Sequence, residues 1–137
     1  MGVQPFLVAS SLVGVLAQRL VRVLCPACKQ AYRPTAEELS QASITPQILK
    51  EAGNPAVLYR SVGCAACQHT GYLGRTGIYE LVTIDDELRT MIHDGAGEQQ
   101  LERYARTRSP SIRDDGLRKA LAGVTTLEEV LRVTRSD

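Results

Sequence analysis

The sequence predicts an α+β fold that is mainly helical, and three observations support this class. The run RLVRVLC at 19–25 and the run GIYELVTI at 77–84 are rich in branched residues, as strands are. From Asp85 onward, residues that start and end helices recur at short intervals. Two identical C-x-x-C pairs separate the two strand-like runs and indicate a small metal-binding insert.

All four cysteines of the chain belong to these pairs, as Cys25 with Cys28 and Cys64 with Cys67. A C-x-x-C turn directs two thiolates at one tetrahedral ion, and two such turns complete a four-thiolate shell. The 35 residues between the pairs exceed the usual gap, but each doubling of a loop costs only about 0.6 kcal/mol in closure entropy. We predict a structural zinc ion with no open coordination position for chemistry.

Three other interpretations of the cysteines compete with zinc. Structural disulfides rarely follow the C-x-x-C pattern, and a redox motif would need only one pair in a thioredoxin-like setting. An iron–sulfur cluster also takes four thiolates, but in ferredoxins they are spaced more closely. His69 lies just beyond Cys67 and is a candidate substitute ligand, although a position facing solvent fits it better.

Composition and charge limit the class of function. A chain of 137 residues makes one domain or two small ones, and 44% hydrophobic residues allow a modest core. Residues 1–60 carry six basic and three acidic side chains, and residues 61–137 carry ten and twelve. Neither half has the basic excess of a nucleic-acid-binding surface, so no nucleic-acid partner is expected. Reduced cysteines favour a cytoplasmic location.

The N-terminal run FLVASSLVGVLA at 6–17 is predicted to be a helix, with Pro5 at its first position. Its apolar residues surround the whole circumference, which is typical of a helix buried in a larger core. A signal peptide would require a basic residue before the apolar run, and none is present. The run is also shorter than the roughly 20 residues that span a bilayer. We therefore expect neighbouring structure outside this chain to cover it.

Helix boundary signals recur along the rest of the chain. Thr35 and Glu38 fit a capping box, and Pro46 follows the candidate cap Thr45. Further helices are predicted at 85–95, 98–107, 111–123 and 125–133, with caps at Ser111 and Thr125 and stops at Gly53, Gly95 and Gly123. Apolar positions that suit a small helical bundle are Leu117, Leu121, Leu127, Val130 and Leu131.

The glycines after the second cysteine pair, Gly71, Gly74 and Gly77, recur every third residue as in phosphate-binding loops. Neither a Lys-Ser/Thr pair nor a helix follows them, so a P-loop is excluded. Glycines at these positions let the backbone wrap tightly around the metal site.

Several charged residues invite a catalytic interpretation that the pattern does not favour. The acidic residues at predicted helix starts are ordinary complements of the helix dipole. They are Asp114, Asp115, Glu128 and Glu129. His93 lies near a helix C-terminus, where a cation is favourable. Arg19 and Arg22 are candidates to face a nucleotide or a neighbouring subunit, but surface salt bridges explain them better.

Three segments together resemble one family. They are GVQPFLVASSLVGVLAQRLVRVLCPAC, GCAACQHTGYLGRTGIYELVTIDDELR and DDGLRKALAGVTTLEEVLRVT, and they cover nearly the whole chain. In this order they resemble the C-terminal part of type II secretion ATPases of the general secretion pathway E family, which are close relatives of type IV pilus assembly ATPases. The resemblance implies a hexameric RecA-like motor, peripheral to the cytoplasmic face of the bacterial inner membrane. Such motors power assembly of a pseudopilus together with inner-membrane platform proteins.

The resemblance also implies a division of the chain. Residues 1–24 would be the terminal piece of the RecA-like core, and residues 25–67 the tetracysteine zinc insert. Residues 68–84 would be the return strand, and residues 85–137 a C-terminal helical subdomain.

The chain departs from the family in lacking a G-x-x-x-x-G-K-S/T motif and the Walker B, Asp-box and His-box segments. We therefore expect no catalytic or nucleotide-binding residues here and no ATP hydrolysis by the chain alone, with ATP and Mg²⁺ bound only in the full-length context. Met1 is expected to be an internal methionine or the edge of a fragment. Alternative functions are a fragment of a type IV pilus assembly ATPase, a freestanding zinc-knuckle adaptor and a chaperone-like zinc module.

Overall fold

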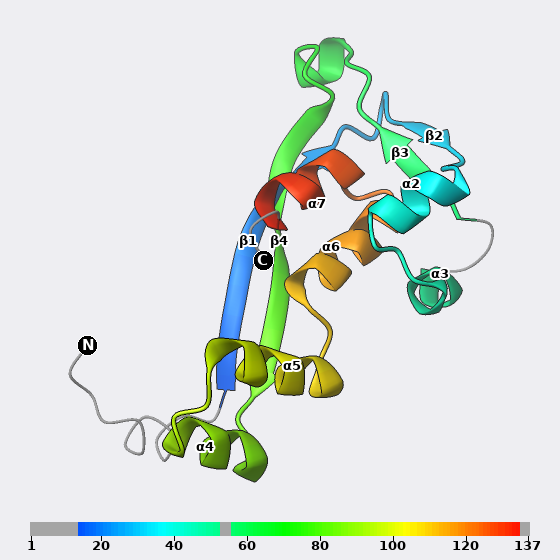
Figure 1. The fold of residues 1–137 in the computed structure, drawn as a ribbon. Coiled ribbons are helices and arrows are strands. Elements are labelled where there is room, and N and C mark those ends of the chain that lie inside the picture. The colour runs from blue at the N-terminus through cyan, green and yellow to red at the C-terminus, as the bar shows by residue number, and fades with distance from the viewer. Residues whose placement is uncertain (1–13, 53–55, 135–137) are drawn as a thin grey trace. The chain divides into compact units, whose positions relative to one another are not determined.

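The structure, a computed structural model, describes residues 14–52 and 56–134 (Figure 1). Its elements are β1 (Gly14–Leu24), β2 (Gln30–Tyr32), α2 (Ala36–Gln41), α3 (Pro46–Ala52), β3 (Leu58–Arg60), the 3-10 turn η1 (Ala65–Cys67), β4 (Tyr72–Thr83), α4 (Asp86–His93), α5 (Glu98–Arg108), α6 (Ile112–Leu121) and α7 (Leu127–Thr134). The chain forms two compact units. Their described residues are 14–17 and 80–111 in unit 1, and 18–52, 56–79 and 112–134 in unit 2.

The α+β class is confirmed, and so are both predicted strands, because β1 and β4 form a two-stranded sheet. The helix predicted at 6–17 is wrong for residues 14–17, which begin β1, while residues 6–13 lie outside the described part of the chain. Pairing with β4 gives this segment the backbone partners that a helix would otherwise supply. Val15 and Leu16 are 47% and 64% exposed, so the burial expected of a core helix is absent at these positions.

The core of unit 2 joins the segment between the cysteine pairs to α6 and α7. The strands β2 and β3 (Figure 1) pair antiparallel with Tyr32 opposite Leu58. The Leu58 side chain is fully buried in the core that it shares with the helices. The core consists of Ala42, Ile44, Ile48, Leu58, Leu117, Ala120, Leu121 and Val130, with Tyr32, Leu39, Leu49 and Leu127 packed against it. The predicted apolar positions of the helical bundle therefore pack largely against the insert.

The helix caps predicted within the insert are confirmed. Glu38 donates its N–H to the Thr35 hydroxyl, and the Glu38 carboxylate accepts from the Thr35 N–H, so α2 begins with a full capping box. The Thr45 hydroxyl accepts from the Ile48 N–H at the start of α3. The predicted stop at Gly53 lies outside the described residues.

The start of α7 corrects one predicted cap. Thr126, not Thr125, caps this helix, because its hydroxyl accepts the Glu129 N–H at 3.2 Å. The Thr125 hydroxyl instead donates to the Arg22 carbonyl of β1 at 2.7 Å. The preceding helix α6 begins directly after the predicted cap Ser111, and Gly123 adopts a left-handed φ of 82° after its end.

Glu129 does far more than complement the dipole of α7. Its carboxylate is 2% exposed and accepts the Arg22 backbone N–H at 2.8 Å and the Arg22 guanidinium at 3.1 Å. The Arg132 guanidinium donates to both carboxylate oxygens at 3.0 and 3.1 Å. Burial raises the pKa of Glu129, but these hydrogen bonds outweigh burial and hold its pKa at about 2.

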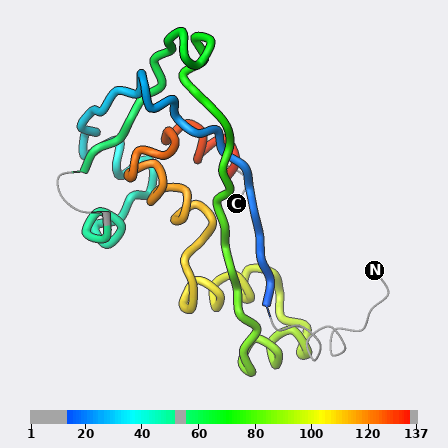
Figure 2. The backbone as a smooth tube through the Cα atoms, turned by 180° about the vertical axis from the view of Figure 1, so that it is seen from behind, coloured from blue at the N-terminus to red at the C-terminus, as the bar shows by residue number. Residues whose placement is uncertain are grey.

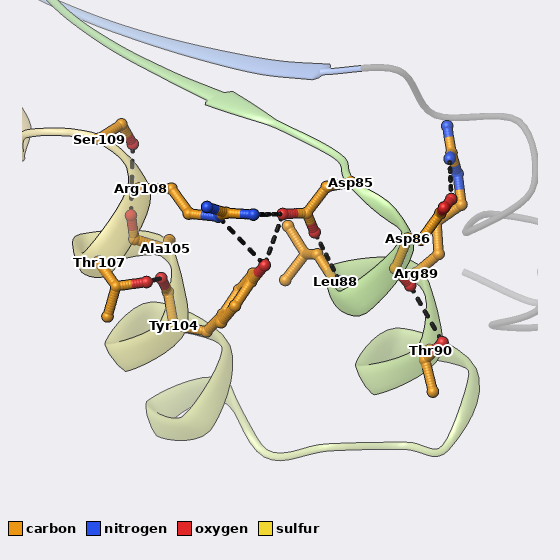
Figure 3. Close-up of polar contacts among 10 residues, drawn as sticks. All are labelled: Asp85, Asp86, Leu88, Arg89, Thr90, Tyr104, Ala105, Thr107, Arg108 and Ser109. Carbon is orange, nitrogen blue, oxygen red and sulfur yellow. Dashed lines mark hydrogen bonds and ion pairs between the residues drawn. The ribbon is translucent and has the colours of Figure 1, made fainter.

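Unit 1 holds its two helices together through a second carboxylate. Asp85 caps α4 by accepting the Leu88 N–H at 2.8 Å, and the Tyr104 hydroxyl of α5 donates to the same carboxylate at 2.5 Å (Figure 3). Arg108 donates to Asp85 from the last turn of α5 at 3.2 Å. The hydrogen bond from Tyr104, followed by that from Leu88, lowers the pKa of Asp85. The predicted helix at 85–95 is confirmed, with His93 as its last residue.

Two further expectations bear on the fold. Within the described ranges, no helix is long and apolar enough to cross a membrane.

The predicted division of the chain at residues 24, 67 and 84 stays a prediction, although the shared core places the insert and the helices α6 and α7 in one compact unit.

Glu129→Gln tests the buried carboxylate through pH. The pKa of Glu129 lies at about 2 in the folded chain, against 4.5 for the free group. This difference contributes about 3 kcal/mol of stability that is fully present above about pH 4.5. As the pH falls from about 4.5 to about 2, the stability is lost, so the wild type and the variant should converge in unfolding free energy.

Urea unfolding of both proteins at a series of pH values measures this convergence. Protonation of the cysteines affects both proteins equally and cancels in the difference. A difference in unfolding free energy that stays constant down to about pH 2 would contradict the prediction.

Candidate metal centre

The four cysteines lie in two turns of unit 2. Cys25 directly follows β1 and begins the turn that contains Cys28, while Cys64 directly precedes the 3-10 turn η1 and Cys67 is its last residue. Figure 2 shows η1 in the green loop between β3 and β4, with the blue turn after β1 below it. The Cys25 N–H donates to the Gly71 carbonyl at 2.9 Å, so the first turn is tied to the start of β4.

The four sulfur atoms converge on one point. Cys25 and Cys64 lie 3.8 Å apart, Cys28 and Cys67 3.9 Å, and Cys64 and Cys67 3.8 Å, all measured between Sγ atoms. All four sulfurs lie within 4.8 Å of one another. In a regular tetrahedron with Zn–S bonds of about 2.3 Å, sulfur neighbours are about 3.8 Å apart. The arrangement therefore fits a single tetrahedral metal ion held by four thiolates.

Backbone N–H groups point at two of the sulfurs. Cys67 Sγ accepts from the N–H groups of Cys64 and Gly71, both at 3.2 Å, and Cys28 Sγ accepts from the Gly63 N–H at 3.3 Å. A donor directed at a sulfur stabilises the negative thiolate over the neutral thiol. These donors prepare the sulfurs to act as metal ligands.

The pKa values of two thiols diverge, because the N–H donors outweigh the opposing effects at Cys67 but not at Cys28. Burial raises the pKa of Cys67, but the N–H donors of Cys64 and Gly71 outweigh burial and bring it down to about 6. The Gly63 N–H lowers the pKa of Cys28, but desolvation and the neighbouring sulfurs raise it to about 11. Several thiolates at such short distances repel one another unless a cation lies between them.

Left-handed backbone at both ends of the second turn lets the chain fold around the sulfurs. Gly63 has a φ of 109° and Gly71 a φ of 84°, while Gln68 and His69 adopt 55° and 62° between them. His69 is exposed, as predicted, and its N–H donates to the Cys64 carbonyl at 2.8 Å. The expectation that glycines wrap the site is confirmed at Gly71, whose N–H donates to Cys67 Sγ. Gly74 and Gly77 instead lie within β4.

Sequence reasoning missed the sulfur donors and the partner of Arg22. Gly63 and Gly71 lie on either side of the second C-x-x-C pair, and this placement is the sequence feature that could have indicated N–H donors to the sulfurs. The expectation of a salt bridge at Arg22 is confirmed, but its partner Glu129 is buried and 107 residues away. Nothing in the local sequence around either residue indicates this pairing. Arg19 is exposed in β1.

Comparison with known proteins identifies relatives over the whole chain. The family model "Type II/IV secretion system protein" matches residues 1–132. A "Type II secretion system protein E" of Pseudomonas aeruginosa is 56% identical over all 137 residues, and a "Type II secretion system ATPase E" of Vibrio cholerae is 54% identical. The "Type IV pilus assembly ATPase PilB" of Thermus thermophilus is 43% identical over 98% of this chain and 15% of its own length. The chain spans 26% of the first two relatives.

Gly71→Ala and Gly74→Ala form a matched pair of variants. Both glycines have a positive φ, 84° and 78°, so alanine strains the backbone similarly at each position. A Cβ at Gly71 would lie 2.5 Å from the Ser61 Cβ, whereas a Cβ at Gly74 meets nothing within 4 Å. Gly71→Ala should therefore displace the N–H donor to Cys67 and weaken Zn²⁺ binding, with an extra loss of stability of about 1–3 kcal/mol.

Competition with a zinc chelator gives the affinity of each variant, and chemical unfolding gives its stability. Equal zinc affinity and equal stability of the two variants would show that the close approach at Gly71 has no part in forming the site.

Proposed function

Because the chain belongs to the type II/IV secretion system protein family, we propose that it is part of a longer ATPase that powers type II protein secretion. The support is the 54–56% identity to two proteins named as type II secretion system components, continuous over the whole chain. The chain spans about a quarter of those proteins. We assign ATP and Mg²⁺ binding, and hydrolysis itself, to the remainder of the longer protein.

Within that protein, the chain contributes a structural zinc site held by Cys25, Cys28, Cys64 and Cys67. The distances between the sulfurs and the N–H donors directed at them support this role. Four thiolates fill a tetrahedral shell, so the ion would fix the two turns and leave no position for water. The zinc would thereby hold the end of β1 against the start of β4.

The wider assembly follows the same proposal. The longer protein would be a RecA-like motor that forms a homo-hexamer in the cytoplasm. It would be peripheral to the inner membrane and contact platform proteins of the secretion machine. The supporting observation is the family match over residues 1–132.

A type IV pilus assembly ATPase is the second candidate. The relative from Thermus thermophilus, which carries that name, is 43% identical over nearly the whole chain. The lower identity places the chain closer to the type II secretion proteins, which we therefore prefer.

Metal analysis tests the zinc site directly. The purified chain should carry about one zinc ion, since four thiolates form one closed site. Cys64→Ser should release the ion and increase hydrogen exchange throughout unit 2, because α6 and α7 share a core with the insert. The helices α4 and α5 of unit 1 should keep their exchange protection. Iron in place of zinc, or a reduced protein without metal, would contradict this assignment.

A chimera tests the secretion function. The homologous segment of the Vibrio cholerae relative is replaced by this chain in a strain lacking the native gene, and secretion of an endogenous exoprotein is measured. We expect secretion to be restored, and Cys64→Ser within the chimera to abolish it. The matched control carries the corresponding segment of the Pseudomonas aeruginosa relative.

The outcomes separate the two candidate functions. A stable chimera that fails to secrete, while the control chimera succeeds, would contradict the type II assignment. Restoration of pilus assembly in an equivalent chimera of the Thermus thermophilus relative, without restored secretion in the first, would favour the pilus function.

A further inference from the structure

A groove of about 520 Å³ in unit 2 gathers three arginines from three elements. Leu20, Val21 and Arg22 of β1, Arg75 of β4 and Arg132 of α7 line it. These arginines lie at least 53 positions apart in sequence, since 75 − 22 is 53 and 132 − 75 is 57. No acidic side chain lines the groove among the residues that the structure describes.

Two of the arginines, Arg22 and Arg132, are held in place by neighbouring side chains. The buried Glu129 carboxylate binds Arg22 and Arg132 together, and the Arg22 guanidinium also lies 4.2 Å over the Tyr72 ring. Their side chains remain 50% and 56% exposed. Because Glu129 and Tyr72 restrict them, less side-chain entropy would be lost when a ligand binds.

The arginines keep donors available for a ligand. Arg22 uses one guanidinium nitrogen for Glu129, and Arg132 uses two. Arg75 is exposed, and within the described part of the chain its guanidinium has no hydrogen bond or ion pair. A fork of N–H donors without a partner is what an anion-binding arginine presents.

The charge of the groove points to a dianion. Three guanidinium groups and one carboxylate give a net charge of +2. A carboxylate ligand is satisfied by a single arginine fork, whereas a phosphoryl group accepts donors from several directions through its three terminal oxygens. Donors that come from β1, β4 and α7 suit the tetrahedral ligand.

We infer that the groove between Arg22, Arg75 and Arg132 is a binding site for a phosphoryl group, separate from the metal centre. Arg75 supplies an unshared bidentate fork, and Glu129 positions the other two guanidiniums. The phosphoryl group belongs either to a free phosphate compound or to a phospholipid whose headgroup is a phosphomonoester, since both present three terminal oxygens. The inference does not depend on the proposed secretion function.

Titration of the metal-loaded 137-residue chain with pyrophosphate, followed by NMR, tests the site. We expect saturable shifts at Arg22, Arg75 and Arg132 at about millimolar concentration. Arg75→Ala should weaken binding by about tenfold or more. Arg75→Lys should recover only part of the affinity, because lysine keeps the charge and loses the fork.

Arg33→Ala is the matched control, since Arg33 is an exposed arginine of unit 2 outside the groove. It removes the same charge and should leave the affinity for pyrophosphate nearly unchanged. Zinc content and thermal unfolding of each variant confirm that it is folded. Equal weakening by Arg33→Ala and Arg75→Ala would overturn the inference, because it would show a general charge effect.

A second arm distinguishes the two sources of the phosphoryl group. Cosedimentation with phosphatidic acid vesicles, against phosphatidylcholine vesicles, measures headgroup binding for the wild type and Arg75→Ala. Binding of pyrophosphate alone identifies a free phosphate compound, and vesicle binding lost in Arg75→Ala identifies a headgroup. Absence of binding in both arms, or binding in both that Arg75→Ala leaves unchanged, overturns the site.

Discussion

The buried carboxylate of Glu129 is the constraint on which unit 2 depends. A charge that is 2% exposed is costly unless it is fully paired, and removing one partner of a buried pair leaves an uncompensated charge. Glu129 meets this requirement with the backbone N–H of Arg22 and the guanidiniums of Arg22 and Arg132. The backbone contact matters most for the fold, because it fixes one position of β1 against α7 whatever the side chain of residue 22 does.

This contact also determines where the metal centre sits relative to the helices. Three residues beyond Arg22, Cys25 donates its N–H to Gly71 and contributes its sulfur to the cluster. Between them, Leu24 donates its N–H to the Val124 carbonyl just before α7. Residues 22–25, which are the end of β1 and the residue after it, therefore connect the buried acid to the sulfur cluster. A shift of β1 by one residue would exchange its two faces and break both attachments at once.

What the sequence predicts correctly is local. The caps at Thr35 and Thr45 involve atoms three residues apart, so their chemistry is visible in the sequence. The cap of α7 was predicted one residue early because the Thr125 hydroxyl bonds to Arg22, 103 residues away. The helix predicted over residues 14–17 is wrong for the same reason, since pairing between β1 and β4 is a distant contact. The cysteine turns were found because the two cysteines of each pair are close in sequence.

The arginine groove shows the limit of local reasoning most clearly. Arg22, Arg75 and Arg132 each lie in an ordinary segment, and each alone fits a solvated surface charge. They are brought together because β1 pairs with β4 and Glu129 holds α7 against β1. Two guanidiniums suffice to satisfy one buried carboxylate, so the stability of Glu129 does not account for the third. Arg75 therefore adds positive charge where the fold itself requires none, and such an excess is a property of binding sites more than of cores.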